Sequence, residues 1–353
     1  MLDDRKLKKN PFSLQLNAED FLPASADEKQ SLVVMRESTT YWKDAVRRLR
    51  KNKVAMVAFA VIILVMFCAF IVPSFYPYHY DQQIRGSEDL RPMQYSEMEL
   101  KSISQGKSVF PHVFGTDSFG RDLGIRVMIG ARISLLVGLI ASFLVLLIGS
   151  IYGAIAGYFG GKVDMVMMRI VDIIYSVPDM LIIILLQVTL KTPLTNLFDS
   201  NPAFAGLQKV GVGLISIFIT FSLLYWVGMA RIVRGQIMTL KEQEFVTAAK
   251  ALGASNRQII AKHLLPNCIG TLIVTTTLQI PSAIFTEAFL SYLGLGVAIP
   301  MASLGSLASD ALGGISAFPY RLIVPSVAIS LIILSFNLFG DGLRDAFDPK
   351  LKK

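Results

Sequence analysis

Acidic side chains inside apolar stretches are the residues of this sequence best suited to chemistry. Asp172, Asp179 and Glu287 all lie within or at the end of long apolar runs. A carboxylate in a membrane span can meet an amino group or water in a translocation pathway, and it is a functional candidate for that reason. The competing role is structural, because Arg169 lies three residues before Asp172 and Pro178 places Asp179 at a kink. From the sequence alone the structural role is favoured.

Sequence patterns of catalysis, nucleotide binding and metal binding are missing. Residues 106–108 read Gly-Lys-Ser, the end of a phosphate-binding loop, but Lys101 stands where the first glycine of that loop belongs. No Gly-x-Ser-x-Gly elbow occurs, and a membrane hydrolase would need a nucleophile beside a base. The histidines are not spaced as metal ligands; they are His79, His112 and His263. We therefore expect no enzymatic activity, no cofactor and no metal in this chain.

A compact loop between two apolar runs, residues 244–266, indicates a second kind of site, one that binds a soluble partner. Gly253 can adopt the left-handed conformation that ends a helix. Ser255 is placed to cap the next helix, with Gln258 completing a capping box, and Pro266 suits the start of the following span. The alternative is an amphipathic helix on the lipid surface, but the sharp turn favours a compact protrusion.

Spacing assigns the faces of the two short helices in this loop. One face of the first helix carries small or apolar side chains, and the alanines leave room for a partner: Phe245, Ala248, Ala249 and Leu252. Three apolar residues of the second helix are expected to face inward: Ile259, Ile260 and Leu264.

The composition indicates what kind of protein carries these residues. The chain has 353 residues, 53% of them hydrophobic, and a mean hydropathy of +0.54, which is typical of membrane proteins. The net charge of +8 would also suit a nucleic-acid-binding protein. The basic residues, however, cluster beside apolar runs, where they set topology and contact anionic lipid. We therefore expect membrane lipid as a partner and no nucleic acid.

Six apolar runs approach the roughly 20 residues that cross a bilayer as a helix. A bilayer offers no water to unpaired backbone groups, so the predicted fold is an all-α integral membrane protein with six transmembrane helices. The expected spans are residues 54–72, 133–156, 166–190, 211–230, 268–290 and 322–343. Glycines four residues apart near the second span would let another helix approach closely, as a static or a moving contact: Gly149, Gly153, Gly157 and Gly161.

Charge predicts the orientation of the spans. Basic residues concentrate in residues 43–53, in 231–263 and near the C-terminus in 344–353. The segment 73–130 instead carries a series of acidic residues: Asp81, Glu88, Asp89, Glu97, Glu99 and Asp117. The excess of positive charge on cytoplasmic loops therefore places the three basic regions and both termini in the cytoplasm. The 73–130 segment is then external.

The remaining segments have weaker signals. Residues 1–40 are polar, without periodicity, and are expected to form a flexible cytoplasmic tail. Residues 41–53 have an apolar and a basic face, which predicts an amphipathic interfacial helix. The glycine-rich residues 291–321 fit a re-entrant loop or a short oblique helix, since irregular backbone at membrane depth must be buried in protein or line a cavity.

Several motifs of this sequence together resemble one family. Thr247-Ala248-Ala249, followed by Gly253 and by Leu265-Pro266, is similar to the "EAA" coupling loop of bacterial ABC importer permeases. Thr247 replaces the usual glutamate of that loop, and Glu244 lies one turn earlier. Motifs that resemble the dipeptide and oligopeptide permease subfamily, C-type subunit, extend the match from about Trp42 to the C-terminus. They occupy residues 114–122 (Phe-Gly-Thr-Asp-Ser-Phe-Gly-Arg-Asp), 130–135, 287–296 and 336–349.

The resemblance implies a type I ABC importer permease core in residues 131–343, preceded by the first span at 54–72. It implies a heterodimer with a homologous permease, two cytoplasmic ATP-binding subunits that hydrolyse ATP, and an extracytoplasmic peptide-binding protein, in a bacterial plasma (inner) membrane. The implied cargo is an oligopeptide or dipeptide, with nickel chelates, opines and signalling peptides as open alternatives. The implied coupling residues match the loop motif: Glu244, Thr247, Ala248, Ala249, Gly253 and Pro266.

A self-sufficient secondary transporter driven by an ion gradient is the alternative function. Such a protein is expected to show paired carboxylates or broken helices in the matching halves of an inverted repeat. The sequence shows no such halves, although Pro178 and the glycine-rich 291–321 segment would suit broken helices. Under the importer hypothesis, the isolated chain should neither take up solute along a gradient nor hydrolyse ATP.

Overall fold

The computed structural model of the chain describes residues 41–200, 204, 206, 211–297 and 301–347. The predicted tail 1–40 and the last six residues lie outside this description. Within the described residues the regular structure is helical, apart from one isolated bridge between Thr116 and Asp122. The chain divides after Asp44 into two units, and the packing described below is that of the second unit.

The prediction of six membrane spans is confirmed, because six helical stretches are long and apolar enough to cross a bilayer. Two of the stretches join consecutive elements: α3 with a 3₁₀ turn at Val72–Ser74, and α9 with α10. The helices are α3 (Lys53–Phe70), α5 (Leu123–Phe159), α7 (Asp179–Ser200), α9 (Val212–Leu224), α10 (Trp226–Leu240), α14 (Ile269–Tyr292) and α16 (Tyr320–Phe347).

The third predicted span, 166–190, is wrong as a single helix. The chain forms α6 (Gly161–Tyr175), breaks at residues 176–178, and resumes as α7 at Asp179. Pro178 has no backbone N–H and disfavours helical geometry at the residue before it, so the break falls where the proline requires it. The fourth span also continues as a helix for ten residues beyond its predicted end. The prediction ended the span before Arg231, but Arg231 and Arg234 pair with acidic residues of α6, so the helix accommodates both charges.

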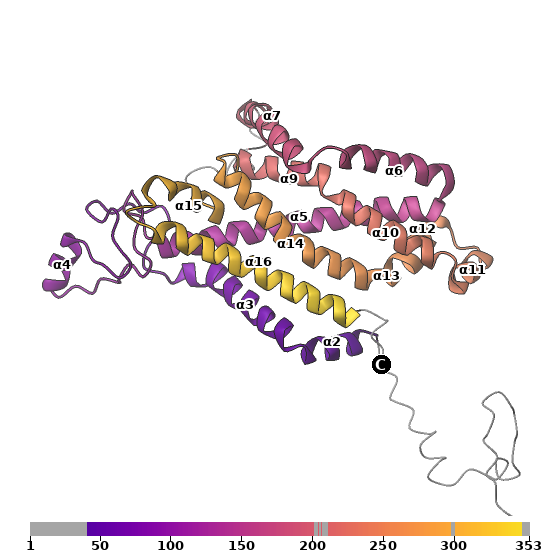
Figure 1. Cartoon of the computed structure of the whole chain (residues 1–353), viewed down its shortest axis with the longest axis horizontal. Coiled ribbons are helices and arrows are strands. Elements are labelled where there is room, and N and C mark those ends of the chain that lie inside the picture. The colour runs from indigo at the N-terminus through magenta and orange to yellow at the C-terminus, as the bar shows by residue number, and fades with distance from the viewer. Residues whose placement is uncertain (1–40, 201–203, 205, 207–210, 298–300, 348–353) are drawn as a thin grey trace, which may run out of the picture. The chain divides into compact units, whose positions relative to one another are not determined.

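The long helix α5 is the centre of the packing, since α3, α9, α10, α14 and α16 all contact it. Figure 1 shows α3 and α16 side by side along one flank of this group. Gly149, Gly153 and Gly157 face α10, as predicted: a Cβ on Gly153 would lie 2.4 Å from the carbonyl oxygen of Ala230. The prediction fails for Gly161, which starts α6 with φ +52 and has no neighbour within 4 Å.

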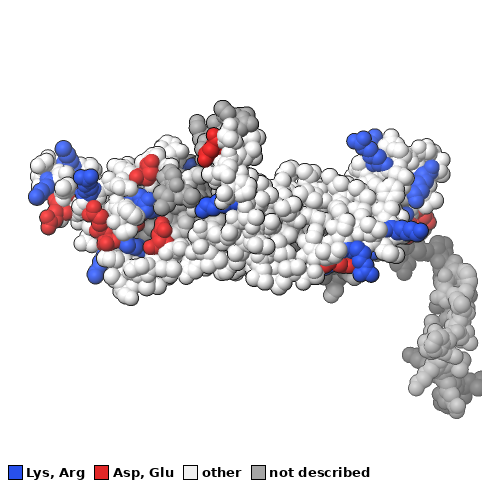
Figure 2. Space-filling view, turned by 90° about the horizontal axis from the view of Figure 1, so that it is seen from above, with Lys and Arg blue, Asp and Glu red and all other residues white. Residues whose placement is uncertain are grey.

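Short elements lie at the two opposite ends of the long helices (Figure 1). At one, here called the loop end, are α11 (Glu244–Ala251), α12 (Asn256–Gln258), a π-helical turn (Ile259–Leu264) and α13 (Leu265–Asn267). At the other, the segment end, residues 75–122 include α4 (Glu97–Ser104), and the short helix expected within 291–321 is present as α15 (Leu304–Asp310). Figure 2 shows charged side chains gathered at both ends, with a largely uncharged surface between them.

A helix, α2 (Tyr41–Lys51), forms where the interfacial helix was predicted. Its expected apolar face includes Ala45, which is buried, and Trp42 and Val46, which are exposed. Asn52 ends this helix and caps the next, since its side-chain oxygen accepts a hydrogen bond from Ala55 N at 3.1 Å. A polar cap therefore marks the change from basic helix to membrane span.

Candidate functional site: the 244–266 loop and the helix breaks

The 244–266 loop is fixed to the bundle by apolar side chains on its underside. Val246 and Ala249 of α11 are buried, and so are Ile259 and Leu264 of the π-helical turn. All four belong to one cluster that also contains buried residues of α5 and α10. A fully buried aliphatic side chain contributes about 1.5–3 kcal/mol, so these contacts hold the loop firmly against the two helices.

The turn between the two parts of the loop forms as the sequence predicts. Gly253 has φ +81, the left-handed conformation that ends α11 without steric cost. Ser255 and Gln258 form the predicted capping box: Ser255 N donates to the Gln258 Oε1 at 2.9 Å, and Gln258 N donates to the Ser255 Oγ at 3.4 Å. These bonds satisfy backbone donors that would otherwise be open at the start of the second helix.

The outer face of α11 is apolar and exposed. Leu252, at its C-terminus, is 88% exposed, and Phe245 and Ala248 are exposed on the same side. The prediction is wrong for Ala249, which is only 7% exposed and packs inward. Ala249 directly follows Ala248, and the rotation of about 100° per residue along the helix brings it to the underside. A nearly uncovered leucine beside a small alanine is a surface suited to a partner.

Two of the other predicted coupling residues lie on α11, and the third lies on α13. Glu244 occupies the first turn of α11, where a carboxylate is favoured by the helix dipole, and Thr247 is exposed one turn later. Pro266 lies in the first turn of α13. The π-helical turn precedes it, with Leu265 N bonded to Ile260 O, and this wider turn makes room for a ring that would clash with a regular helix.

Polar contacts add to the mounting of the loop. The Tyr158 hydroxyl, near the end of α5, donates to Asn256 Oδ1 at 2.8 Å, and the Lys250 ammonium lies 5.6 Å from the centre of the Tyr158 ring. Lys241 Nζ donates to the Gly157 carbonyl oxygen at 3.1 Å, which satisfies one of the open acceptors at the C-terminus of α5. The end of α5 therefore contacts the residue Lys241 just before the loop and both short helices within the loop.

Acidic residues of α6 form ion pairs with α10. Asp172 pairs with Arg231 at 2.8 Å, not with Arg169 as the sequence suggested, because α10 lies beside this face of α6. Asp164 pairs with both Nε and Nη2 of Arg234. These two pairs join α6 to α10 in the half of the bundle nearest the loop.

Asp179 lies apart from Asp172, beyond the break. A cavity of about 490 Å³ opens where α6 gives way to α7 and where α9 gives way to α10. Asp179 lines it and is exposed, and its Oδ1 accepts a hydrogen bond from Met180 N at 2.9 Å. The seven-residue spacing of Asp172 and Asp179 predicts that they share one face of a continuous third span. This prediction is wrong, since the break puts the two residues on different helices.

Glu287 does not line that cavity. Its side chain is fully buried in α14, accepting hydrogen bonds from Ser134 Oγ at 2.8 Å and from Ser291 Oγ at 2.7 Å. Ser134 belongs to α5, so the carboxyl group joins two helices near the segment end. The structure therefore separates the three acidic candidates, and Asp179 is the one that lines the cavity.

Comparison with known proteins gives the family. A model described as "binding-protein-dependent transport system inner membrane component" matches residues 149–353, and one described as "N-terminal TM domain of oligopeptide transport permease C" matches residues 40–92. The chain belongs to this family of permeases. That membership confirms the predicted importer permease, and nothing found supports the secondary transporter.

Individual relatives of the permease cover almost its whole length. The oligopeptide transport system permease protein OppC of Bacillus subtilis is 42% identical over 94% of this chain and 97% of its own length. The dipeptide transport system permease protein DppC of the same organism is 41% identical over 96% and 95%. A solved structure of the MetNI methionine ABC transporter in an inward-facing conformation has a TM-score of 0.45 and 20% identity, covering 62% of this chain and 94% of that one.

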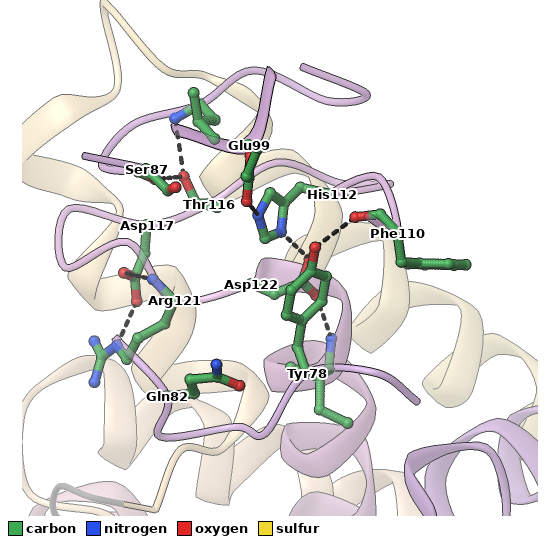
Figure 3. A network of polar contacts seen from close by, with 12 residues as sticks. Tyr78, Gln82, Ser87, Glu99, Phe110, His112, Thr116, Asp117, Arg121 and Asp122 are labelled. Atoms are coloured by element: carbon green, nitrogen blue, oxygen red, sulfur yellow. Dashed lines mark hydrogen bonds and ion pairs between the residues drawn. The ribbon is translucent and has the colours of Figure 1, made fainter. Parts of the chain in front are cut away.

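The segment end of the permease contains a buried histidine that the sequence did not single out as a structural centre. His112 is 0% exposed; its Nδ1 lies 2.7 Å from Asp122 Oδ2 and its Nε2 lies 3.0 Å from Glu99 Oε1 (Figure 3). Burial alone would lower the pKa of His112, but the hydrogen bonds to Asp122 and Glu99 outweigh it and raise the pKa. Both ring nitrogens donate to carboxylates only if the ring is protonated.

The two carboxylates are themselves fixed at helix starts. Glu99 belongs to the capping box of α4 with Ser96, and Asp122 caps α5 by accepting from Ile125 N at 3.0 Å. The signals that could have found them are these capping patterns, a serine three residues before a glutamate and an aspartate just before an apolar helix. The ring of Tyr78 stacks on His112 with 4.5 Å between centres.

The spacing of Asp117 and Arg121 in the 114–122 motif has a structural explanation. Asp117 accepts hydrogen bonds from Phe119 N at 2.8 Å, from Arg121 N at 3.0 Å and from Arg121 Nε at 2.7 Å, and it pairs with Arg126 of α5. One carboxylate thus organises the turn and joins it to the helix.

No cluster of His, Cys, Asp or Glu suited to a metal ion occurs among the residues that the structure describes.

Proposed function

We propose that this permease carries peptides into a bacterial cell as half of an ATP-driven translocation pathway. Its partners are a homologous second permease, two cytoplasmic ATP-binding subunits and an extracytoplasmic peptide-binding protein, in the plasma membrane with both termini in the cytoplasm. The names and near-complete coverage of the Bacillus subtilis relatives support the cargo. The basic residues near the loop end support the orientation, because cytoplasmic loops carry the excess of Lys and Arg.

The observation that carries the proposal is the contrast between the two faces of α11. Its underside, with Val246 and Ala249, is buried in the cluster that α5 and α10 share. Its outer face presents Phe245, Ala248 and Leu252 to solvent. A helix that is held firmly on one side and has an exposed apolar face on the other is suited to dock on a partner. In this family of importers, the proposed partner surface is a groove on an ATP-binding subunit.

Coupling follows from how the loop is mounted. When ATP brings the two ATP-binding subunits together, each would move the loop docked in its groove. The loop is packed on α10, and α10 lies against the glycines of α5 and is ion-paired to α6. Displacement of the loop therefore displaces three helices together, and access to the pathway alternates between the two sides.

Substitution of Ala248 by tryptophan tests the docking. The side chain is exposed, so Ala248→Trp should leave folding and membrane insertion intact while it blocks close approach of the ATP-binding subunit. We expect loss of co-purified ATP-binding subunit and at least about a tenfold loss of peptide uptake, the effect of about 1.4 kcal/mol at the contact.

The matched control is Ala317→Trp, because Ala317 is an exposed alanine at the segment end. It should retain both co-purification and uptake. Normal ATP-driven uptake in the Ala248→Trp variant would show that the loop is not the docking site.

A further inference from the structure

The cavity at the two helix breaks lies beside the middle of one candidate membrane span. α9 and α10 together form one candidate span, Val212–Leu240, and Tyr225, where they meet, is midway along it. Tyr225 and Asp179 both line the cavity. We propose, building on the peptide import above, that this cavity binds the protonated amino group of the cargo, with the Asp179 carboxylate as its anionic contact.

The other acidic residues of these helices already have partners. Asp164 and Asp172 of α6 pair with arginines of α10, and Glu287 accepts hydrogen bonds from two serines. Within the described residues, no Lys or Arg forms an ion pair with Asp179, whose only hydrogen bond there is from the neighbouring Met180 N. Asp179 is thus a carboxylate at membrane depth still able to take a cation, and such groups mark substrate or ion pathways.

The walls of the cavity fit an amine attached to an organic body rather than a bare metal ion. Most of the lining is apolar, with Ile182, Leu224 and Val227 among its side chains. The Tyr225 hydroxyl is held by Thr286 Oγ1 at 2.5 Å, which fixes the ring at the cavity wall. A volume of about 490 Å³ falls within the range of about 300–1,000 Å³ usual for small-molecule sites.

The broken helices supply further acceptors. α6 ends at Tyr175 and α9 ends at Leu224, and both ends line the cavity. The last carbonyl groups of a helix lack partners within it, and an ammonium group has three N–H donors to satisfy. One carboxylate and nearby carbonyl oxygens together meet that requirement, while the apolar walls accept a variable side chain.

Photo-crosslinking tests this inference in the complete assembly of both permeases and both ATP-binding subunits in nanodiscs. Ile182, a cavity residue, is replaced by p-benzoyl-phenylalanine, and a radiolabelled tripeptide is added in excess without the binding protein. The same peptide with an acetylated N-terminus is the comparison. We expect the free amine to crosslink about tenfold more than the acetylated form, the ratio typical of one charge-assisted hydrogen bond.

Two variants assign the effect. Asp179→Asn should make the two peptides crosslink equally, whereas Asp172→Asn, which alters a paired carboxylate outside the cavity, should keep the preference. Absence of any crosslink, or a preference that survives Asp179→Asn, would overturn the inference. Failure of the peptide-import proposal would be distinguished by a separate result, the absence of ATP-dependent peptide uptake by the unmodified assembly supplied with its binding protein.

Discussion

The two ends of the helical bundle hold their connecting segments in place by different physical means. At the segment end the contacts are buried charges: His112 lies between two carboxylates, and Asp117 collects donors from two arginines. At the loop end the underside of α11 is fixed by apolar side chains, and its outer face is left uncovered. Buried charge pairs hold a segment in one geometry. Apolar packing on one side of a helix also holds that helix in place, and it leaves the other side free to bind a partner.

Removal of the Asp117 carboxylate should have the largest effect and should be confined to the segment end. Asp117→Ala leaves the nearly buried side chain of Arg121 without its anionic partner, and it leaves Arg126 with only the longer contact to Asp310 Oδ2 at 3.8 Å. An uncompensated buried charge costs about 3–5 kcal/mol, so we expect a large fall in the thermal unfolding temperature of the permease in detergent. The control is Asp81→Ala, because Asp81 forms an exposed pair with His79 and such pairs contribute about 0–1 kcal/mol. Equal stability of the two variants would contradict the account of the segment end.

Truncation of Ile259 should weaken the loop end by a smaller amount and independently of pH. Ile259 is fully buried beneath α11, and an Ile→Ala change in a core costs about 2–5 kcal/mol. We expect Ile259→Ala to increase hydrogen exchange in residues 244–252 and to lower coupling between ATP hydrolysis and uptake. The increase in exchange over the unmodified protein should be the same at pH about 6 and about 9. The buried residues of that cluster include one titratable side chain, Cys268, and burial raises its pKa above this interval. A pH-dependent increase would mean that charge also holds the loop.

Titration of His112 should give the smallest effect, and only at the segment end. Its pKa in the folded chain is raised, so its contribution to stability is complete below the unfolded value of about 6.5 and is lost as pH rises through the folded value. Proteolysis within residues 75–122 should therefore quicken from pH about 6 to about 9. The other titratable groups that contact the ring are Glu99, Asp122 and Tyr78, and Tyr76 lies beside Tyr78 and Asp122. Burial raises the pKa of Tyr78 to about 12, outside this interval.

His112→Gln removes the titration and is the matched variant. Its proteolysis rate should be high at both pH values, with no increase between them. A rate that still rises with pH in this variant would assign the effect to another group. A charged His112 would then not be what stabilises the segment end.

The sequence predicted the loop end better than the segment end, for a physical reason. Capping boxes and a left-handed glycine act over three or four residues, so Gly253, Ser255 and Gln258 could be placed correctly from the sequence. The contacts of His112 join residues 10 and 13 positions away across irregular backbone, and no periodic pattern reports them. The number of spans could be predicted from the apolar runs because the hydrophobicity of a span is also a local property of the sequence.

Contacts between helices limited the prediction of the acidic residues. The partner of Asp172 is Arg231, 59 positions later, so the nearby Arg169 was a misleading candidate. Glu287 was correctly placed at the end of its span, but its burial depends on the approach of α5, which the sequence does not report. The break at Pro178 had a local signal, yet its consequence, a cavity shared with Tyr225, required the packing of α7 on α9.

The most direct test of the central claim is site-specific crosslinking from the outer face of α11. In a variant with Cys68 and Cys268 replaced by serine, Leu252→Cys should crosslink to the cytoplasmic ATP-binding subunit in native membranes, and Val246→Cys, at a fully buried position, should not. That result would establish the docking face and the cytoplasmic position of the loop end together. Reaction of Leu252→Cys with lipid alone, or with the extracytoplasmic binding protein, would contradict both.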